Sequence, residues 1–210
     1  MKIKSLLLAL FLSSSILCAE PYLGVEALFV SPSSDNRASG EAIGGSGFDD
    51  GMGFGAKAGF RLVDNFALEL QLLYFKTDET ASLDTDFGTF SGKQELTMGT
   101  GFLNALLDLA AMRGPFPLFL EIGGGIGLAI LNNDVSVSGP GFSDSGSDID
   151  TAFAWQVIGN LGYRVTDWLA LGFTARYMNF GDARWGERDI IVEAENLSAT
   201  AFGAFALVEF

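Results

Sequence analysis

Apolar and polar residues alternate along this chain in stretches of about ten residues, the length of a tilted strand that crosses a membrane. In residues 66–76, Leu68, Leu70 and Leu72 share one face of an extended strand, while Glu69 and Gln71 lie on the other. Because successive side chains of a strand point to opposite faces, this period of two predicts strands rather than helices. The pattern recurs and predicts eight strands, over residues 22–30, 53–63, 66–76, 99–112, 116–130, 152–165, 168–178 and 200–210.

One face of each predicted strand is almost purely apolar, whereas the other carries small residues, amides and a few charges. Soluble up-and-down barrels that hold a ligand show the inverse arrangement, with an apolar interior and a polar exterior. The sequence therefore predicts an all-β fold, a transmembrane up-and-down antiparallel β-barrel of eight strands. A transmembrane helix over residues 117–131 is the alternative for one stretch. Glu121 and three consecutive glycines at 123–125 disfavour it, because glycine destabilises helices and the charge would lie mid-span.

The connections between the predicted strands alternate in length. Tight turns are expected at residues 63–65, 113–115 and 166–167, and long polar loops at residues 31–51, 77–98, 131–151 and 179–199. Short turns on one side and long loops on the other are typical of bacterial outer-membrane barrels, whose short turns lie in the periplasm. We therefore expect periplasmic termini and extracellular loops that hold most of the acidic residues.

Aromatic residues gather near both ends of the predicted strands on the apolar face, which predicts two interfacial girdles. The girdle near the short turns comprises Phe60, Phe66, Phe116, Tyr163 and Phe210, and the girdle near the loops comprises Phe29, Phe54, Tyr74, Phe153, Trp155, Tyr177 and Phe202. The last residue, Phe210, is also the candidate assembly signal, through which the final strand would engage the barrel-assembly machinery.

The first nineteen residues have the features of a secretory signal peptide. Lys2 and Lys4 form a basic start, residues 6–12 form a short apolar core, and small residues precede Glu20. We expect residues 1–19 to be removed, which leaves an outer-membrane β-barrel domain over residues 20–210.

The predicted mature chain has no cysteine and is strongly acidic. Cys18, the only cysteine, would leave with the signal; a lipoprotein would need a small residue before it, where Leu17 stands. Without Lys2 and Lys4 the chain carries 10 basic and 26 acidic residues, a net charge of −16. Such a surface repels polyanions, so nucleic acid is not expected as a partner.

Two short segments resemble a known group of proteins. The stretch TDWLALGFTARY at residues 166–177 resembles the penultimate strand of small outer-membrane barrels, the opacity-type and OmpA-type transmembrane families, and PYLGVE at residues 21–26 resembles their opening strand. The resemblance extends over the mature chain as a pattern. It implies an eight-stranded barrel in the outer membrane of a diderm bacterium, in families that serve as adhesins, immune-evasion surface proteins or structural anchors.

The chain contains no histidine, which removes the usual base of serine triads and the commonest metal ligand. Barrel enzymes of similar architecture, which modify lipid A, cleave phospholipids or cleave proteins, use histidine in their mechanisms. We therefore expect no enzyme, no catalytic residue and no cofactor; a pair of carboxylates remains the alternative, and no spacing indicates one. The acidic segments 84–88 and 144–150 suggest calcium, but neither matches a known calcium loop, so solvated disordered loops without metal are favoured.

Charged residues on the polar strand faces are expected to lie in the lumen. They are Glu26, Lys57, Arg61, Glu69, Asp108, Glu121, Arg164, Arg176 and Glu209. Because an eight-stranded barrel has room only for its own side chains or one small ligand, and because buried charges must pair, a salt-bridged plug is favoured over a gated ion path. The expected hubs are Arg61, Arg164 and Arg176, with Glu26, Glu69, Asp108 and Glu121 as their partners.

Two functional hypotheses follow. The first is a non-enzymatic outer-membrane protein with a filled polar lumen and acidic extracellular loops, in a structural or adhesin-like role. Its partners would be outer-membrane lipids, lipopolysaccharide and an extracellular ligand or host surface, with Trp185 as a candidate anchor. The second is a narrow channel or binding barrel for small or hydrophobic molecules. Its motivation is a set of apolar residues on the lumen face: Leu28, Leu73, Phe75, Phe119, Ile158, Phe205 and Leu207.

Overall fold

Every regular element in the described part of the chain is a β-strand. The computed structural model describes residues 20–38, 41–42, 49–63, 65–85, 88–110, 117–139, 141–185 and 192–210. Its strands are β1 (Glu20–Ala38), β2 (Glu41–Ala42), β3 (Gly51–Val63), β4 (Phe66–Thr85), β5 (Gly88–Asp108), β6 (Leu118–Gly139), β7 (Phe142–Arg164), β8 (Leu169–Trp185) and β9 (Val192–Glu209). Within these ranges, no helix is long and apolar enough to cross a bilayer.

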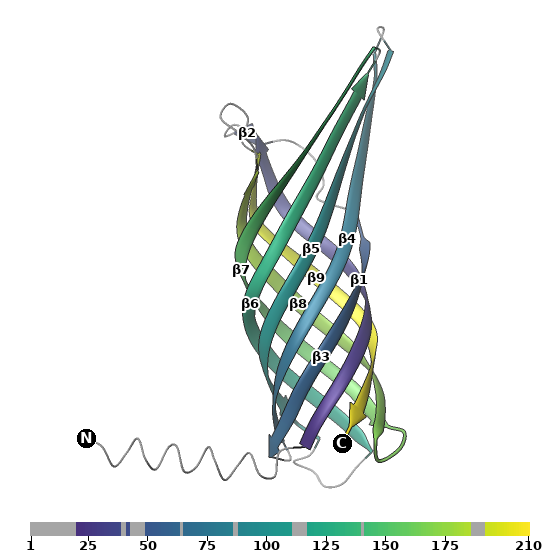
Figure 1. Ribbon diagram of the computed structural model, residues 1–210, viewed down its shortest axis with the longest axis vertical. Coiled ribbons are helices and arrows are strands. Elements are labelled where there is room, and N and C mark those ends of the chain that lie inside the picture. Colours follow the sequence, from purple (N-terminus) through teal and green to yellow (C-terminus); the bar gives the residue numbers. More distant parts are fainter. Residues whose placement is uncertain are drawn as a thin grey trace, which may run out of the picture.

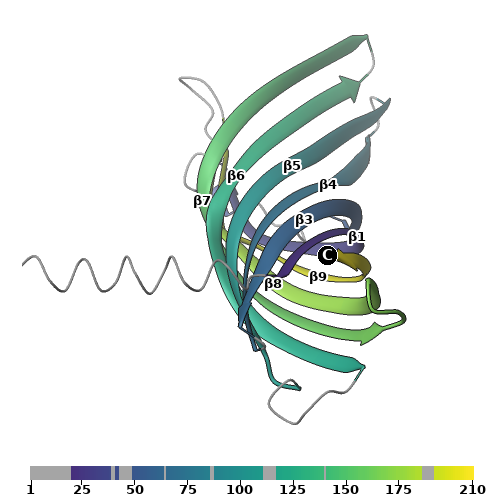
Figure 2. The ribbon, with the colours of Figure 1, turned by 60° about the horizontal axis from the view of Figure 1, so that its bottom comes forward.

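The strands close into a barrel. From β3 onwards each strand pairs antiparallel with the next, β1 pairs with β3, and β1 also pairs with β9 (Figure 1). The short strand β2 pairs only with the far end of β1, outside the closed wall. The eight remaining strands therefore form an up-and-down antiparallel barrel, seen with its lower end forward in Figure 2, and the predicted fold class is confirmed.

The two ends of the barrel differ. Phe210 donates its N–H to the carbonyl of Pro21, so the first and last strands meet at one end, here called the terminal end. The turn after β7 also lies there, where Val165 donates to the carbonyl of Leu169 and the Thr166 hydroxyl accepts from the Leu169 N–H. The opposite end, here called the hairpin end, carries the connections β4–β5 and β6–β7.

Two of the predicted long loops are wrong. Residues 77–98 and 131–151 continue the strands into hairpins, which close where Thr85 faces Gly88 and where Gly139 faces Phe142. Strand also extends over residues 31–38, 179–185 and 192–199. The prediction required one apolar face, and these extensions have polar residues on both. Backbone hydrogen bonds do not need an apolar face, so the ladder continues beyond it.

Other predictions of local structure have mixed outcomes. The fourth predicted strand was expected to reach residue 112, but β5 ends at Asp108 and a turn follows. The acidic segment 144–150, interpreted as a disordered loop, lies within β7. Residues 1–19, the turn at 113–115, Phe116 and part of the segment 84–88 lie outside the described residues.

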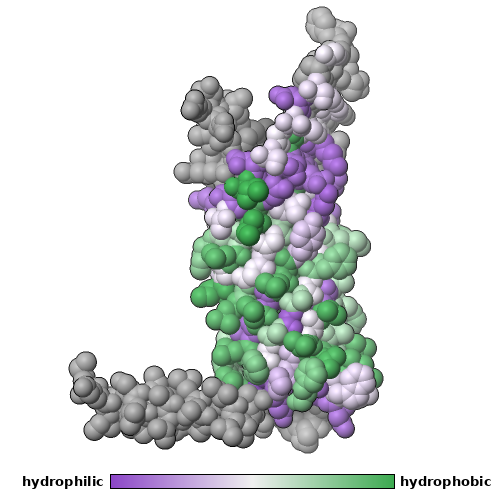
Figure 3. Space-filling model, in the orientation of Figure 1, coloured by the Kyte–Doolittle hydropathy of each residue, from purple (hydrophilic) through white to green (hydrophobic). Residues whose placement is uncertain are grey.

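On the face drawn in Figure 3, apolar residues cover the barrel from the terminal end upward as a broad band, and a polar zone lies above it. The band consists of outward-facing side chains such as Leu70, Ile126 and Phe173, which are all more than half exposed. Ten of the expected girdle residues are exposed at the ends of this band: Phe29, Phe54, Phe60, Tyr74, Phe153, Trp155, Tyr163, Tyr177, Phe202 and Phe210. Phe66 is half-buried.

Above the apolar band, the wall divides into two sheets. β3 begins at Gly51, and β7 pairs with β8 only as far as the pair Trp155–Asn179. Beyond these points β4, β5, β6 and β7 continue as one sheet, here called the hairpin-end sheet, while β2, β1, β9 and β8 form the other. The two sheets diverge at the top of Figure 1.

Candidate functional site: the barrel interior

The interior is filled by side chains from all eight barrel strands, in layers. An apolar layer lies toward the hairpin end and comprises Leu28, Val30, Leu73, Phe75, Leu96, Met98, Phe102, Ala129, Leu131, Ala152, Ala154, Met178, Phe180, Leu197, Ala199 and Ala201. Within it the rings of Phe75 and Phe180, from β4 and β8, lie 6.2 Å apart between centroids. A smaller apolar cluster, with Phe119 and Phe205 at its centre, lies toward the terminal end.

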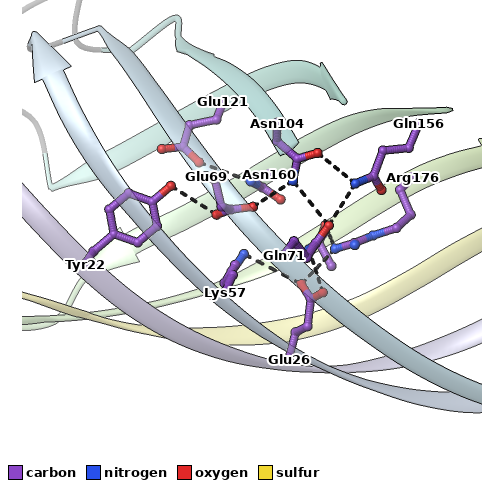
Figure 4. Close-up of polar contacts among 11 residues, drawn as sticks. Tyr22, Glu26, Lys57, Glu69, Gln71, Asn104, Glu121, Gln156, Asn160 and Arg176 are labelled. Atoms are coloured by element: carbon purple, nitrogen blue, oxygen red, sulfur yellow. Dashed lines mark hydrogen bonds and ion pairs between the residues drawn. The ribbon is translucent and has the colours of Figure 1, made fainter. Parts of the chain in front are cut away.

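A polar group at mid-height centres on the carboxylate of Glu26. Arg176 donates from Nη2 to Glu26 Oε2 at 2.7 Å, and Lys57 Nζ lies 3.6 Å from the same oxygen. Gln71 donates to the other oxygen, Oε1, at 2.8 Å. Lys57 also lies over the Phe205 ring, 4.2 Å from its centroid. Two cations and an amide therefore converge on one buried carboxylate (Figure 4).

Amide side chains continue this group across the lumen (Figure 4). Gln156 donates to Gln71 Oε1 at 2.9 Å and to Asn104 Oδ1 at 2.8 Å. Asn104 in turn donates to Glu69 Oε1 at 3.1 Å, and the Tyr22 hydroxyl donates to Glu69 Oε2 at 3.0 Å. One connected chain of hydrogen bonds thus joins strands β1, β4, β5 and β7.

A second group of charges lies nearer the terminal end. Arg61 Nη2 lies 3.1 Å from Glu121 Oε1 and 3.2 Å from Glu209 Oε1. Arg164 donates to Glu209 Oε2 at 3.2 Å, and Asn160 donates to Glu121 at 3.1 Å. Since both arginines also lie near aromatic rings, cation–π contacts add to the ion pairs.

The structure places all nine candidate charges inside the barrel. Seven are buried and two, Arg164 and Glu209, are partly exposed at the terminal end. Arg176 pairs with Glu26 and Arg61 pairs with Glu121, both within the expected sets. The carboxylate beside Arg164 is Glu209, which was not among the expected partners.

Two expected carboxylates accept hydrogen bonds from groups other than arginine. Glu69 accepts hydrogen bonds from the neutral side chains of Tyr22 and Asn104. Asp108 accepts from the backbone N–H groups of Ala110 at 2.9 Å and Leu120 at 3.3 Å, which ties the end of β5 to the start of β6.

The predicted list of lumen charges left out the neutral members of these groups. They are Tyr22, Gln71, Asn104, Gln156 and Asn160. Each lies on the same strand face as a candidate charge, so the alternation itself was the signal that could have included them. The apolar residues that motivated a ligand-binding lumen are also buried inside, so the apolar and the charged candidates share the interior. They are Leu28, Leu73, Phe75, Phe119, Ile158, Phe205 and Leu207.

Inward-facing glycines make room for the long side chains that cross the lumen. A Cβ at Gly162 would overlap the Phe119 ring, and one at Gly125 would overlap the Asn104 amide. On the outer face of the same strand as Gly162, a Cβ at Gly159 would have its nearest neighbour at 4.0 Å. The inward glycines therefore set which side chains fit inside.

Charges also lie on the outer surface of the hairpin-end sheet, beyond the girdle residue Tyr74. Lys76 Nζ lies 2.6 Å from Glu95 Oε1, and Lys93 Nζ lies 3.6 Å from both Glu95 and Asp78. The hydrogen bond from Lys76 lowers the pKa of the Glu95 carboxyl from its ordinary value, and it raises the pKa of Lys76. Among the described residues, no three acidic, cysteine or histidine side chains are arranged to hold a metal ion.

Solved structures of outer-membrane proteins share this fold. Neisserial surface protein A aligns with a TM-score of 0.54 and 18% identity, over 91% of this chain and 99% of its own. OprG from Pseudomonas aeruginosa aligns with a TM-score of 0.57 and 14% identity, over 91% and 95%. Ail, the attachment invasion locus protein of Yersinia pestis, solved with the heparin analogue sucrose octasulfate, aligns with a TM-score of 0.51 and 11% identity, over 91% and 99%.

At these identities the structural similarity establishes the fold alone, and no curated protein sequence matches the chain. The family model of the outer membrane protein β-barrel domain matches residues 5–210, almost the whole chain. The apolar band therefore faces the lipid of a bacterial outer membrane, and the chain belongs to the outer membrane protein β-barrel domain family.

Proposed function

We propose that this protein is a non-enzymatic barrel of the outer membrane whose own side chains close the lumen, and whose hairpin end interacts with partners at the cell surface. The observation that carries the proposal is the interior itself. An apolar layer lies directly on a polar group in which Arg176 and Lys57 both form ion pairs with Glu26. An ion would have to displace buried partners of both kinds, at a cost of several kcal/mol per charge.

The proposed orientation puts the termini in the periplasm and the hairpin end outside the cell. Its support is the asymmetry of the barrel, with a tight turn between β7 and β8 at the terminal end and long polar hairpins at the other. Phe210, exposed at the edge of the apolar band, would then face the periplasmic assembly machinery during insertion. Protease added to intact cells should cleave the hairpins and spare the parts of the strands that lie within the apolar band.

Planar bilayers test the closed lumen. Purified protein, refolded in detergent and shown by its heat-dependent gel mobility to be a closed barrel, should give no reproducible conductance steps. Steady steps that scale with salt concentration would overturn the proposal and favour a channel.

A second candidate function is a binding barrel for a small hydrophobic molecule. The observation that favours it is the apolar layer, which places Phe75, Met98, Phe180 and other side chains next to the hairpin end. A hydrophobic fluorescent probe distinguishes the candidates, because saturable binding lost in a Phe180→Trp variant would support a pocket in this layer. Binding that is absent, or that does not respond to this change, supports the closed interior.

The charge of the hairpin end indicates which surface partners fit. Ail was solved in complex with sucrose octasulfate, a polyanion that is an analogue of heparin. Here β7 presents Asp144, Asp148 and Asp150 at the hairpin end, and the whole chain carries a net charge of −14. We therefore propose a cationic or neutral partner rather than a sulfated polysaccharide, with lipopolysaccharide around the barrel. Retention on immobilised heparin at physiological salt would contradict this assignment.

A further inference from the structure

The wall of the barrel has a free strand edge beside β8. β7 and β8 pair from Arg164–Ala170 to Trp155–Asn179, yet β7 continues to Phe142 and stays paired with β6 throughout. Residues 142–154 of β7 therefore have β6 on one side and no described strand on the other. This segment is here called the β7 edge. A free edge of this length presents unpaired backbone groups, to which another strand can add.

The register shows which N–H groups of the β7 edge face the open side. Arg164 donates its N–H to the carbonyl of Pro117, next to β6, whereas Val165 donates to Leu169, next to β8. The pairing of β6 with β7 runs without a register shift from Leu118–Tyr163 to Gly139–Phe142. The backbone N–H groups of successive residues in a strand point to alternate sides. The odd-numbered residues of the β7 edge therefore point their N–H groups toward the open side next to β8, here called the gap.

Aspartate side chains occupy three of these N–H groups. Ser145 donates to Asp144 Oδ1 at 2.9 Å and Ile149 donates to Asp148 Oδ1 at 2.8 Å. Thr151 donates to Asp150 Oδ1 at 2.7 Å. In each case the acceptor is the preceding residue in the chain, so the sequence repeats an Asp-X unit along the edge.

Between Ser145 and Thr151 the one odd-numbered residue without such a cap is Ser147, which follows Gly146 and so has no side chain before it. At the ends of the edge, Ser143 and Phe153 follow apolar residues that cannot act as caps. On β8, just beyond the last β7–β8 pair, the Gly181 N–H also donates to a side chain, Asn179 Oδ1, at 3.1 Å.

We infer that Asp144, Asp148 and Asp150 close the β7 edge to strand addition, which keeps the gap beside β8 open and keeps the hairpin-end sheet from pairing with a second copy of this chain. An incoming strand needs the N–H groups of the edge as donors, and here it would first have to displace three carboxylates. Charge alone would also repel a second acidic sheet, so the experiment must separate capping from repulsion.

Three triple variants make that separation. Alanine at Asp144, Asp148 and Asp150 removes both caps and charges, whereas asparagine at the same positions removes the charges and keeps an acceptor oxygen at the cap position. The matched control changes Asp49, Asp50 and Asp134 to alanine. It removes the same charge from positions off this edge, because Asp49 and Asp50 are exposed before β3, and the half-buried Asp134 lies on β6 between β5 and β7.

Sedimentation in detergent and amide hydrogen exchange are the measurements. We expect the alanine triple to dimerise or form larger assemblies, while the asparagine triple and the control stay monomeric. The inference is overturned if the alanine triple stays monomeric, or if the asparagine triple or the control associates to the same degree.

A milder variant covers the case in which the alanine triple does not refold. Asp148→Ala alone should speed amide exchange at Ile149 by about tenfold, the effect of losing one hydrogen bond, and leave Thr151 unchanged. Equal exchange at Ile149 in the variant and the parent protein would overturn the capping role.

Discussion

The Nη2 atom of Arg176 lies 2.7 Å from the Oε2 atom of Glu26, and neither side chain is exposed. Removing one partner of a buried ion pair leaves an uncompensated charge, which commonly costs about 3–5 kcal/mol. We expect Arg176→Met to lower the free energy of unfolding, measured with urea in detergent, by roughly 3 kcal/mol, since Lys57 and Gln71 still hold the carboxylate.

The control for that variant is Lys76→Met. It breaks an ion pair of similar length, 2.6 Å, on the exposed surface, where solvent screens the charges. The unfolding midpoint of Lys76→Met should fall far less than that of Arg176→Met. Equal losses in the two variants would show that burial does not govern the strength of the interior pair.

Substitution by alanine should have opposite effects on stability at two glycines of β7. Gly162→Ala introduces a methyl group against the buried Phe119 ring, and overpacking of this kind costs about 1–3 kcal/mol. Gly159→Ala meets no close neighbour on the lipid side, so it should be neutral or stabilising by roughly 0.5 kcal/mol, because alanine loses less backbone entropy. Heat-dependent gel mobility gives both transition temperatures, and a drop for Gly159→Ala as large as for Gly162→Ala would contradict the assignment of faces.

The apolar layer should be the part of the interior that blocks ions. Replacing Phe75 and Phe180 together by alanine removes the paired rings, so we expect brief conductance steps in planar bilayers that the parent protein lacks. Phe173→Ala, which truncates an equally large side chain on the lipid face, should remain silent. If the double variant folds and is also silent, the polar groups below must provide the barrier.

The charge cluster on the hairpin-end sheet should titrate abnormally. Because the hydrogen bond from Lys76 lowers the pKa of Glu95 in the folded state, Glu95 contributes stability above its unfolded pKa and loses it as the pH falls through the folded value. A carboxyl-detected NMR titration should find the Glu95 midpoint below the ordinary pKa of a glutamate carboxyl. Lys76→Met should move this midpoint upward, and no movement would point to Lys93 instead.

The alternation of residues such as Glu69 and Leu70 was enough to predict the strand number, the topology and the inward face, because a lipid-facing strand must separate the two kinds of side chain. It did not predict the hairpins, since Val135 and Ser136 lie above the membrane, where no such separation is required. Nor did it predict the pair Arg164–Glu209, which depends on the shear of the closed barrel. Asn104 and Gln156 were visible as inward residues, but amides have no charge to indicate their partners.

The pairing of β1 with β9 has a consequence for how the molecule forms. Glu26 and Arg176 are separated by 150 positions in the chain. Strands from the two ends of the chain must therefore meet before these two side chains can form their ion pair. Contacts of such long range form late and slow folding, because the intervening chain has to be ordered first. Until that moment only Lys57 and Gln71 hold the Glu26 carboxylate. It needs water in the place of arginine, which a half-inserted sheet in lipid does not provide. Membrane insertion and ring closure should therefore be concerted, with the carboxylate passing from solvent to arginine in one step.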